Sequence, residues 1–333
     1  MFNNLVNLQD FAHLASSFRS GRILQLLRRM LSGRTSATQA AWDTFQDAPI
    51  EFWHIPVLQQ RVNRLVSGDP RVDYISYVTR KYLAEGPLAG LSLGCGKGHK
   101  ELRWASLGNF SRLDAYDLSP ERIAIAQADA RARGIANVHF HVGDVYRLDW
   151  PLSRYDVVFG DQSLHHFAPI ESLYANIHRT LKPGGYFVLN EYIGPARFQW
   201  TSRQLEAANA LLSLLPPRYR VRWQDKNLKQ RVHRPSRLSM MLADPSEAVE
   251  SNKIVPCLGK YFEIVERRDY GGTLLHPLFG DIAWNFQEDL PDIHKWLQLC
   301  FEIEDLLLAR REIASNFSLI VCQPHSESEL KRT

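Results

Sequence analysis

Short strand-like runs, each closed by a glycine or by a carboxylate, recur through the middle of the chain. These runs are 91–93, 112–116, 138–142, 155–160 and 186–191. Helical patterns separate them; between the second and third runs, for example, Ile123, Ala126 and Ala130 are spaced along one helix face. Strands that alternate with helices in this way favour an α/β fold.

The first run leads directly into three glycines at alternate positions, Gly94, Gly96 and Gly98, and a helical segment begins at His99. Glycines let the backbone approach a ligand where a Cβ would clash. The start of the helix adds N–H donors and the positive end of a dipole. We therefore expect a nucleotide-sized cradle here. The dinucleotide fingerprint G-x-G-x-x-G is not met, because His99 stands where it needs its third glycine.

Acidic residues follow the second and third runs. Asp117 comes about 20 residues after the glycine turn, a spacing at which a carboxylate at a strand end accepts hydrogen bonds from ribose hydroxyls. Asp144 follows the third run. Both acids would lie at the carboxyl ends of strands, where open α/β sheets bind ligands. Either acid could instead cap the helix that follows it.

The segment Leu181-Lys182-Pro183-Gly184-Gly185 is expected to end a helix just before the run at 186–191. This segment and the G-x-G-x-G turn carry a family resemblance. From Leu91 to Tyr192 the chain resembles the class I S-adenosylmethionine-dependent methyltransferases. The resemblance implies a Rossmann-like, doubly wound, mostly parallel seven-stranded sheet. Its last two strands would lie at 262–267 and 316–322, and its cofactor would be S-adenosyl-L-methionine.

The same resemblance assigns a cofactor site. The three glycines would lie against the methionine moiety, Asp117 would bind the ribose, and Asp144 would bind the adenine amino group beside Val145. The full set of expected cofactor-binding residues is Gly94, Cys95, Gly96, Gly98, Asp117, Leu118, Asp144, Val145 and Asp161.

The segment that follows the fourth run, 161–167, is where the methyl acceptor of these enzymes usually lies. Its Leu164-His165-His166 resembles small-molecule methyltransferases, and the lack of proline at 162 and 163 counts against a nucleic-acid amine as acceptor. A histidine can take the proton of a hydroxyl as the methyl moves. We expect His165 to be this base, with His166 as the alternative, and Glu191 to orient His165. All three could instead only anchor the loop.

The expected reaction is methyl transfer to a hydroxyl of a small molecule, a sugar or a glycan. Two segments, "NEYIGPARFQW" and "GGTLLH", resemble bacterial methyltransferases of polysaccharide modification. No cluster with metal-ligand spacing is visible, so no metal is expected to be required. His276, after a glycine pair, is a weaker site candidate. Two alternatives stay open: an RNA methyltransferase, and a non-catalytic relative that binds the cofactor.

Composition and helical spacing divide the rest of the chain. The expected parts are a basic amphipathic segment at 1–35, a helical layer at 36–88, the cofactor-binding core at 89–195, a helical lid insertion at 196–255, the end of the sheet with a helical insertion at 256–323, and a polar tail at 324–333. Helices are expected at 72–83, 204–215, 246–250 and 291–311. Aromatic residues of the helical layer could cap the cofactor or wall the acceptor, although core packing is favoured: Trp42, Phe45, Phe52, Trp53 and His54.

The net charge of +4 is unevenly distributed. Residues 1–34 carry five arginines against Asp10 alone, and residues 216–237 carry eight Lys or Arg against Asp225 alone. The first stretch would form a helix that lies on an anionic membrane surface, or one that packs on the catalytic domain. The second would bind a phosphate-bearing part of the acceptor, or would be a solvated loop.

Four scattered cysteines without C-x-x-C spacing favour a reducing compartment. No apolar run approaches the roughly 20 residues of a membrane span, and the N-terminus lacks the apolar core of a signal peptide. We therefore expect a cytoplasmic protein, peripheral to the inner face of the membrane if the first stretch binds lipid. The oligomeric state stays open.

Overall fold

The computed structural model describes residues 34–44 and 50–326. The amphipathic segment expected at 1–35 lies almost wholly outside the described residues, as do Phe45 and the end of the polar tail.

Seven strands form one sheet in the order β3-β2-β1-β4-β5-β7-β6. Neighbours among β1 to β5 run parallel, whereas β7 runs antiparallel to both β5 and β6. This confirms the predicted mostly parallel seven-stranded sheet. The strands are β1 (Leu88–Leu93), β2 (Phe110–Asp117), β3 (Val138–Val142), β4 (Tyr155–Asp161), β5 (Leu181–Tyr192), β6 (Phe262–Gly271) and β7 (Phe317–Pro324).

The strand order reverses beside β1, which lies between β2 and β4. In open α/β sheets such a reversal leaves a crevice outside the carboxyl ends of the strands, because the connections leave in opposite directions. The glycine turn follows β1 and the histidine segment follows β4, so both expected halves of the site meet at this reversal.

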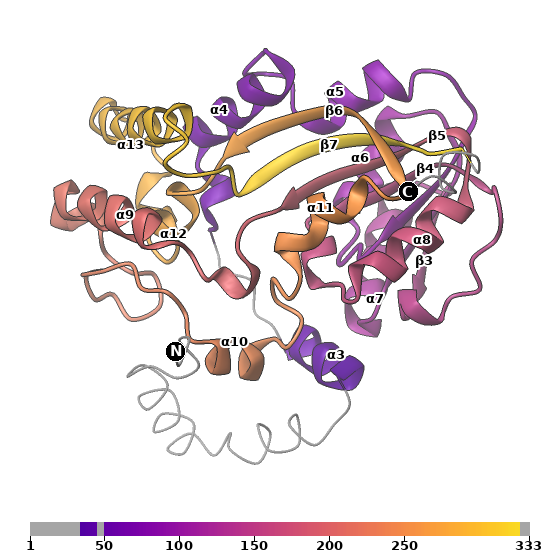
Figure 1. The fold of residues 1–333 in the computed structure, drawn as a ribbon, viewed down its shortest axis with the longest axis horizontal. Helices are drawn as coiled ribbons and strands as arrows, with labels where there is room; N and C mark the ends of the chain where they lie inside the picture. Colours follow the sequence, from indigo (N-terminus) through magenta and orange to yellow (C-terminus); the bar gives the residue numbers. More distant parts are fainter. Residues whose placement is uncertain (1–33, 45–49, 327–333) are drawn as a thin grey trace.

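Helices cover the sheet, and some of them lie beyond one of its ends. They are α3 (Arg34–Thr44), α4 (Pro56–Ser67), α5 (Tyr74–Tyr82), α6 (His99–Leu107), α7 (Pro120–Ala132), α8 (Ile170–Thr180), α9 (Ser202–Leu214), α10 (Arg237–Ala243), α11 (Ile254–Leu258), α12 (Leu275–Phe279) and α13 (Pro291–Ala309). Helix α12 contacts both α9 and α13, and the three lie together at the left of Figure 1.

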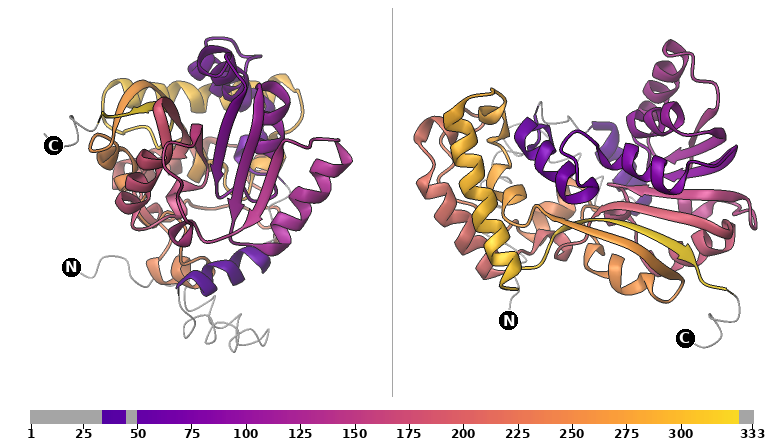
Figure 2. Two further views of the ribbon diagram at one scale, coloured as in Figure 1. Left: turned by 90° about the vertical axis from the view of Figure 1, so that its right-hand side faces the viewer. Right: turned by 90° about the horizontal axis from the view of Figure 1, so that it is seen from above.

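Each face of the sheet has its own apolar core, because successive strand residues point to opposite faces. In β4, Val157 and Phe159 belong to one core and Val158 to the other. The first core is covered by α4 to α7, and the second by α8 and α11. Figure 2 shows these helices on both sides of the sheet. Burial on both faces explains why the central strands β1, β4 and β5 read as apolar runs, whereas β3 at the edge of the sheet alternates.

Local signals fix most of the helix boundaries. The carboxylate of Asp73 accepts a hydrogen bond from the Ser76 N–H (2.9 Å) and begins α5, close to the predicted start of 72–83. Thr201 and Gln204 form a reciprocal capping box at the start of α9. The predicted helices at 204–215 and 291–311 are confirmed as α9 and α13.

Two local predictions are wrong. Residues 246–250 form turns rather than a helix, because the guanidinium of Arg197 takes the carbonyls of Asp244, Pro245 and Glu247. Those carbonyls would otherwise accept helical hydrogen bonds. The segment 181–185 begins β5 instead of ending a helix: Leu181 already pairs with Tyr155 of β4.

Within the two described ranges, the helices lack the combination of length and apolar character needed to cross a bilayer. All four cysteines are free thiols.

Candidate functional site

The glycine turn after β1 requires glycine for its backbone shape. Gly96 has a φ of +54° and Gly98 a φ of +76°, both in the left-handed region. A Cβ on Gly98 would come within 2.6 Å of the Phe140 ring, whereas a Cβ on Gly96 would meet, of the residues that the structure describes, only the Arg122 guanidinium, at 3.6 Å. Gly98 therefore allows α6 to pack on the sheet, and Gly96 keeps the surface of the turn open.

Asp117 ties β2 to the glycine turn. One carboxylate oxygen accepts the Gly96 N–H (2.8 Å) and the other accepts the Ser119 N–H (2.9 Å). Burial raises the pKa of Asp117, while these hydrogen bonds and Arg122 oppose the rise. Each oxygen retains a second lone pair that a ribose hydroxyl could use. The Asp144 carboxylate accepts a hydrogen bond from the Tyr146 N–H (3.0 Å) and so caps a short 3₁₀ turn. This is the capping role that the sequence left open for Asp144.

A cavity of about 580 Å³ lies over this turn. All nine expected cofactor-binding residues line it, Cys95, Leu118, Val145 and Asp161 among them. Helix α3 closes one side: Thr35, Thr38 and Trp42 line the cavity, and the Asp43 carboxylate accepts a hydrogen bond from the Ser119 hydroxyl (2.6 Å). The volume lies within the range of small-molecule sites.

Asp161 at the end of β4 is held by three groups. Its carboxylate accepts hydrogen bonds from the Tyr74 hydroxyl (2.6 Å), the Lys100 ammonium (2.8 Å) and the Asn190 amide (3.2 Å). These partners come from three elements, α5, α6 and β5. Asp161 therefore fixes the floor of the cavity, and its contacts leave little capacity for a ligand.

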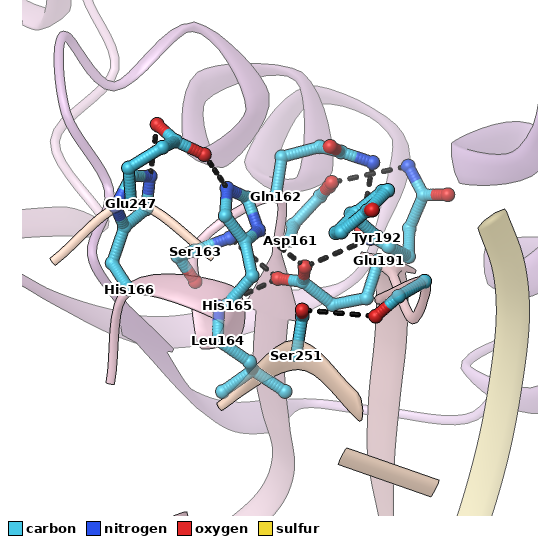
Figure 3. A network of polar contacts seen from close by, with 12 residues as sticks. Asp161, Gln162, Ser163, Leu164, His165, His166, Glu191, Tyr192, Glu247 and Ser251 are labelled. Carbon is cyan, nitrogen blue, oxygen red and sulfur yellow. Dashed lines mark hydrogen bonds and ion pairs between the residues drawn. The ribbon is translucent and has the colours of Figure 1, made fainter. Parts of the chain in front are cut away.

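Glu191 is fully buried at the end of β5 and organises the histidine segment (Figure 3). Its Oε1 accepts the N–H groups of Ser163 and Leu164, and its Oε2 lies 2.7 Å from Nδ1 of His165. Burial alone would lower the pKa of His165, but the carboxylates of Glu191 and Glu247 together outweigh burial, and the pKa is raised. The expectation that Glu191 orients His165 matches this geometry, and so does the anchoring alternative.

The other histidine and a third residue complete a compact group. Nδ1 of His166 lies 3.1 Å from the Ser246 hydroxyl. The Glu247 carboxylate approaches both rings, with Oε1 3.7 Å from Nε2 of His165 and Oε2 3.9 Å from Nε2 of His166 (Figure 3). Burial and the neighbouring His165 place the pKa of His166 well below its usual value. Burial raises the pKa of Glu247 to about 7, although His165 opposes that rise.

A second cavity, of about 900 Å³, lies beside the first. Aromatic rings form much of its wall, and His165, His276 and Glu247 line it. The two cavities share six lining residues: Trp42, Glu51, His54, Lys100, Gln162 and His166. The two cavities are therefore adjacent.

Residues 88–237 match a family model described as a methyltransferase domain. This part of the chain, fewer than half of its residues, is therefore similar to S-adenosylmethionine-dependent methyltransferases. S-adenosylmethionine is the cofactor of this domain family, and the cavity over the glycine turn fits it, since Asp117 and the three glycines line it.

Three relatives illustrate the likeness. The uncharacterized methyltransferase YcgJ of Bacillus subtilis is 27% identical over 105 residues, which are 32% of this chain and 41% of that protein. A demethylmenaquinone methyltransferase of Thermus thermophilus is 28% identical over 136 residues, 41% of this chain and 61% of that protein. The geranyl diphosphate C-methyltransferase of Streptomyces coelicolor A3(2) is 15% identical, with a TM-score of 0.49 and coverage of 88% of this chain and 98% of that one. The chain thus spans less than two thirds of the length of the first two relatives.

Several site residues of the methyltransferase domain were not predicted. Lys100 could have been found, because it lies in the first turn of the helix after the glycines. Tyr74 and Glu247 carry no such signal, since each reaches the site from a segment far away in the sequence. Trp42, Phe52, Trp53 and His54 of the helical layer line the cavities, as the capping or wall alternative proposed, and Phe52 is at the same time buried in the core.

The basic stretch has structural contacts of its own. Arg218 pairs with Asp292, and the buried end of Lys229 donates to the carbonyls of Pro277, Leu278 and Gly280 at the end of α12. Trp223 and Gln224 of this stretch line the second cavity. The eight basic side chains of 216–237 are absent from the described residues that line either cavity. Binding of an anionic acceptor by this stretch stays a prediction.

Proposed function

We propose that this protein transfers the methyl group of S-adenosylmethionine to a hydroxyl of a small molecule, with a sugar or glycan as the finer expectation. The observation that carries the proposal is the wall of six residues shared by the two cavities. A donor over the glycine turn and an acceptor in the aromatic cavity would meet there, and holding two reactants in line lowers the barrier of the transfer.

Different residues would bind the cofactor, exclude water and bind the acceptor. The glycine turn and Asp117 would hold the cofactor, whose sulfonium supplies an electrophilic methyl group when bound. Helix α3 would exclude water from the cofactor side through Trp42. On the acceptor side, Nδ1 of His276 is buried without a hydrogen-bond partner among the described residues, and burial lowers its pKa to about 4. A neutral imidazole there suits a hydrogen bond with the acceptor.

His165 is the proposed base. With its Nδ1–H donated to Glu191, its Nε2 is the atom that can take a proton. In the step, the acceptor oxygen forms a bond to the methyl carbon, the carbon–sulfur bond breaks with its electron pair left on sulfur, and the hydroxyl proton passes to Nε2. Glu191 then stabilises the imidazolium, much as a buried carboxylate does in other histidine dyads.

The aromatic lining of the second cavity supports a ring-shaped acceptor. Its walls include Phe52, Trp53, Tyr192, Phe198, Trp223 and Phe317. Aromatic faces stack on flat rings and on the apolar faces of sugars, while the polar groups between them can bind hydroxyls.

The test is transfer of labelled methyl to a panel of sugars, glycans and phenols. We expect S-adenosylhomocysteine to form with at least one hydroxylated acceptor, and His165→Ala to lower turnover about 10²-fold or more with unchanged cofactor affinity. The matched control is His294→Ala, since His294 is an exposed histidine of α13 outside both cavities. Cofactor binding without transfer to any acceptor in the panel or in cell extract would show a non-catalytic relative and refute the proposal.

A further inference from the structure

We propose that His165, His166 and Glu247 bind one divalent transition-metal ion, which takes the acceptor hydroxyl as a further ligand. The acceptor half of this inference rests on the proposed function; the metal site itself does not.

The spacing of the three donors suits an ion better than it suits direct contacts. The Glu247 oxygens lie 3.7 and 3.9 Å from the two Nε2 atoms, which is longer than a hydrogen bond. Donor atoms from the three residues all lie within 4.8 Å of one another. Ligands at bond lengths of about 2.1 Å around a tetrahedral ion are about 3.4 Å apart, so small side-chain movements would complete the site.

Each histidine ring is already oriented by a polar partner at its Nδ1 atom. Nδ1 of His165 faces the Glu191 carboxylate at 2.7 Å, and Nδ1 of His166 faces the Ser246 hydroxyl at 3.1 Å. Metal-binding histidines almost always use the other ring nitrogen in this way, because the partner fixes both the tautomer and the direction of the ring. Here the two partners direct both Nε2 atoms toward Glu247.

The loop that carries Glu247 is held in place at some cost. Arg197, with a φ of +55°, donates its backbone N–H to Ala248 (2.7 Å) and its guanidinium to three carbonyls of the loop. Ala248 itself has a φ of +46°. Left-handed backbone at a residue other than glycine costs about 1–3 kcal/mol and gathers at functional sites. This arrangement places the Glu247 carboxylate beside the two histidines.

Two imidazoles and one carboxylate favour zinc, iron, cobalt or nickel over magnesium, which prefers oxygen ligands. Three protein ligands leave a position open for a substrate. An ion there would lower the pKa of the bound hydroxyl, and the hydroxyl proton would pass to water in the cavity. With the ion bound, Nε2 of His165 is a ligand and no longer takes that proton, so the ion replaces the direct base step.

The test begins with metal binding alone. Zn²⁺ and Co²⁺ are titrated into the metal-free full-length protein by calorimetry, and the visible spectrum of the Co²⁺ form is recorded. We expect one ion per chain, at least about tenfold weaker binding in His166→Ala and Glu247→Gln, and binding about 10- to 100-fold weaker in Ser246→Ala. His294→Ala should bind as the wild type does. Circular dichroism of each variant excludes unfolding as the cause of lost binding.

Equal binding by the wild type and Glu247→Gln, or no binding by the wild type, would overturn the site. Methyl transfer at full rate after chelation would overturn the acceptor role and leave His165 as the base. Tight, Glu247-dependent binding with no transfer to any acceptor would keep the metal site and refute the proposed function instead.

Discussion

Alanine at three left-handed glycines would separate backbone strain, packing and cofactor contact in one experiment. Gly96, Gly98 and Gly134 have φ values of +54°, +76° and +66°. Each alanine therefore meets the same left-handed penalty of about 1–2 kcal/mol. The space around the new Cβ differs: among residues 34–44 and 50–326, nothing lies within 4 Å at Gly134, and only the Arg122 guanidinium lies near at Gly96.

At Gly98 the new methyl group would overlap its neighbours. The Cβ would lie 2.6 Å from the Phe140 ring and 2.8 Å from the Cβ of Ala126, where carbon atoms normally approach to about 3.5–4.0 Å. Both neighbours are buried, one on β3 and one on α7, so neither can move without disturbing the core. Overpacking of this kind costs about 1–3 kcal/mol beyond the strain.

The assay combines urea unfolding with calorimetric binding of S-adenosylhomocysteine. Gly98→Ala should unfold with about 1–3 kcal/mol less free energy than Gly134→Ala. Gly96→Ala should be about as stable as Gly134→Ala but bind S-adenosylhomocysteine at least about tenfold more weakly, a loss of about 1.4 kcal/mol. Equal stability of Gly98→Ala and Gly134→Ala would refute the packing argument. Wild-type affinity in Gly96→Ala would show that the cofactor does not lie against this turn.

Three further outcomes are expected. Burial raises the pKa of Glu101 from 4.5 to about 7, so the folded state holds that proton more tightly than the unfolded state does. The free energy of unfolding should therefore fall by about 3 kcal/mol as the pH rises from about 5 to 8. Glu101→Gln should remove this pH dependence from the free energy of unfolding measured with urea. Arg61→Ala leaves the fully buried Glu304 without its cation and should lower the free energy of unfolding by about 3 kcal/mol in the same assay. Arg71→Ala removes one partner of an exposed ion pair and should change that free energy little. Similar losses of unfolding free energy in the two variants would contradict the argument. The full-length protein should sediment with anionic vesicles and a variant lacking residues 1–33 should not; equal sedimentation would favour packing on the domain.

The sheet and the cofactor half of the site were predictable because their signals are local. A strand, a glycine turn and a helix follow one another within a dozen residues, and Asp117 lies one strand further along. The acceptor half was harder, since its residues come from segments far apart in the sequence. Glu247 follows a proline-containing turn whose shape is set by Arg197, some fifty residues earlier. Nothing local distinguishes it from an ordinary surface acid.

The loop at 244–250 forms part of both cavities at once, because Ser246 lines the first and its neighbour Glu247 lines the second. A single peptide unit thus joins the two walls. Any ligand that shifts this loop in one cavity must alter the other, so the two substrates should bind cooperatively. Such coupling is reciprocal: if bound cofactor raises the affinity for the acceptor by some factor, bound acceptor raises the affinity for the cofactor by the same factor. Either ligand could then bind first, and the coupling between them would follow from the architecture of one loop.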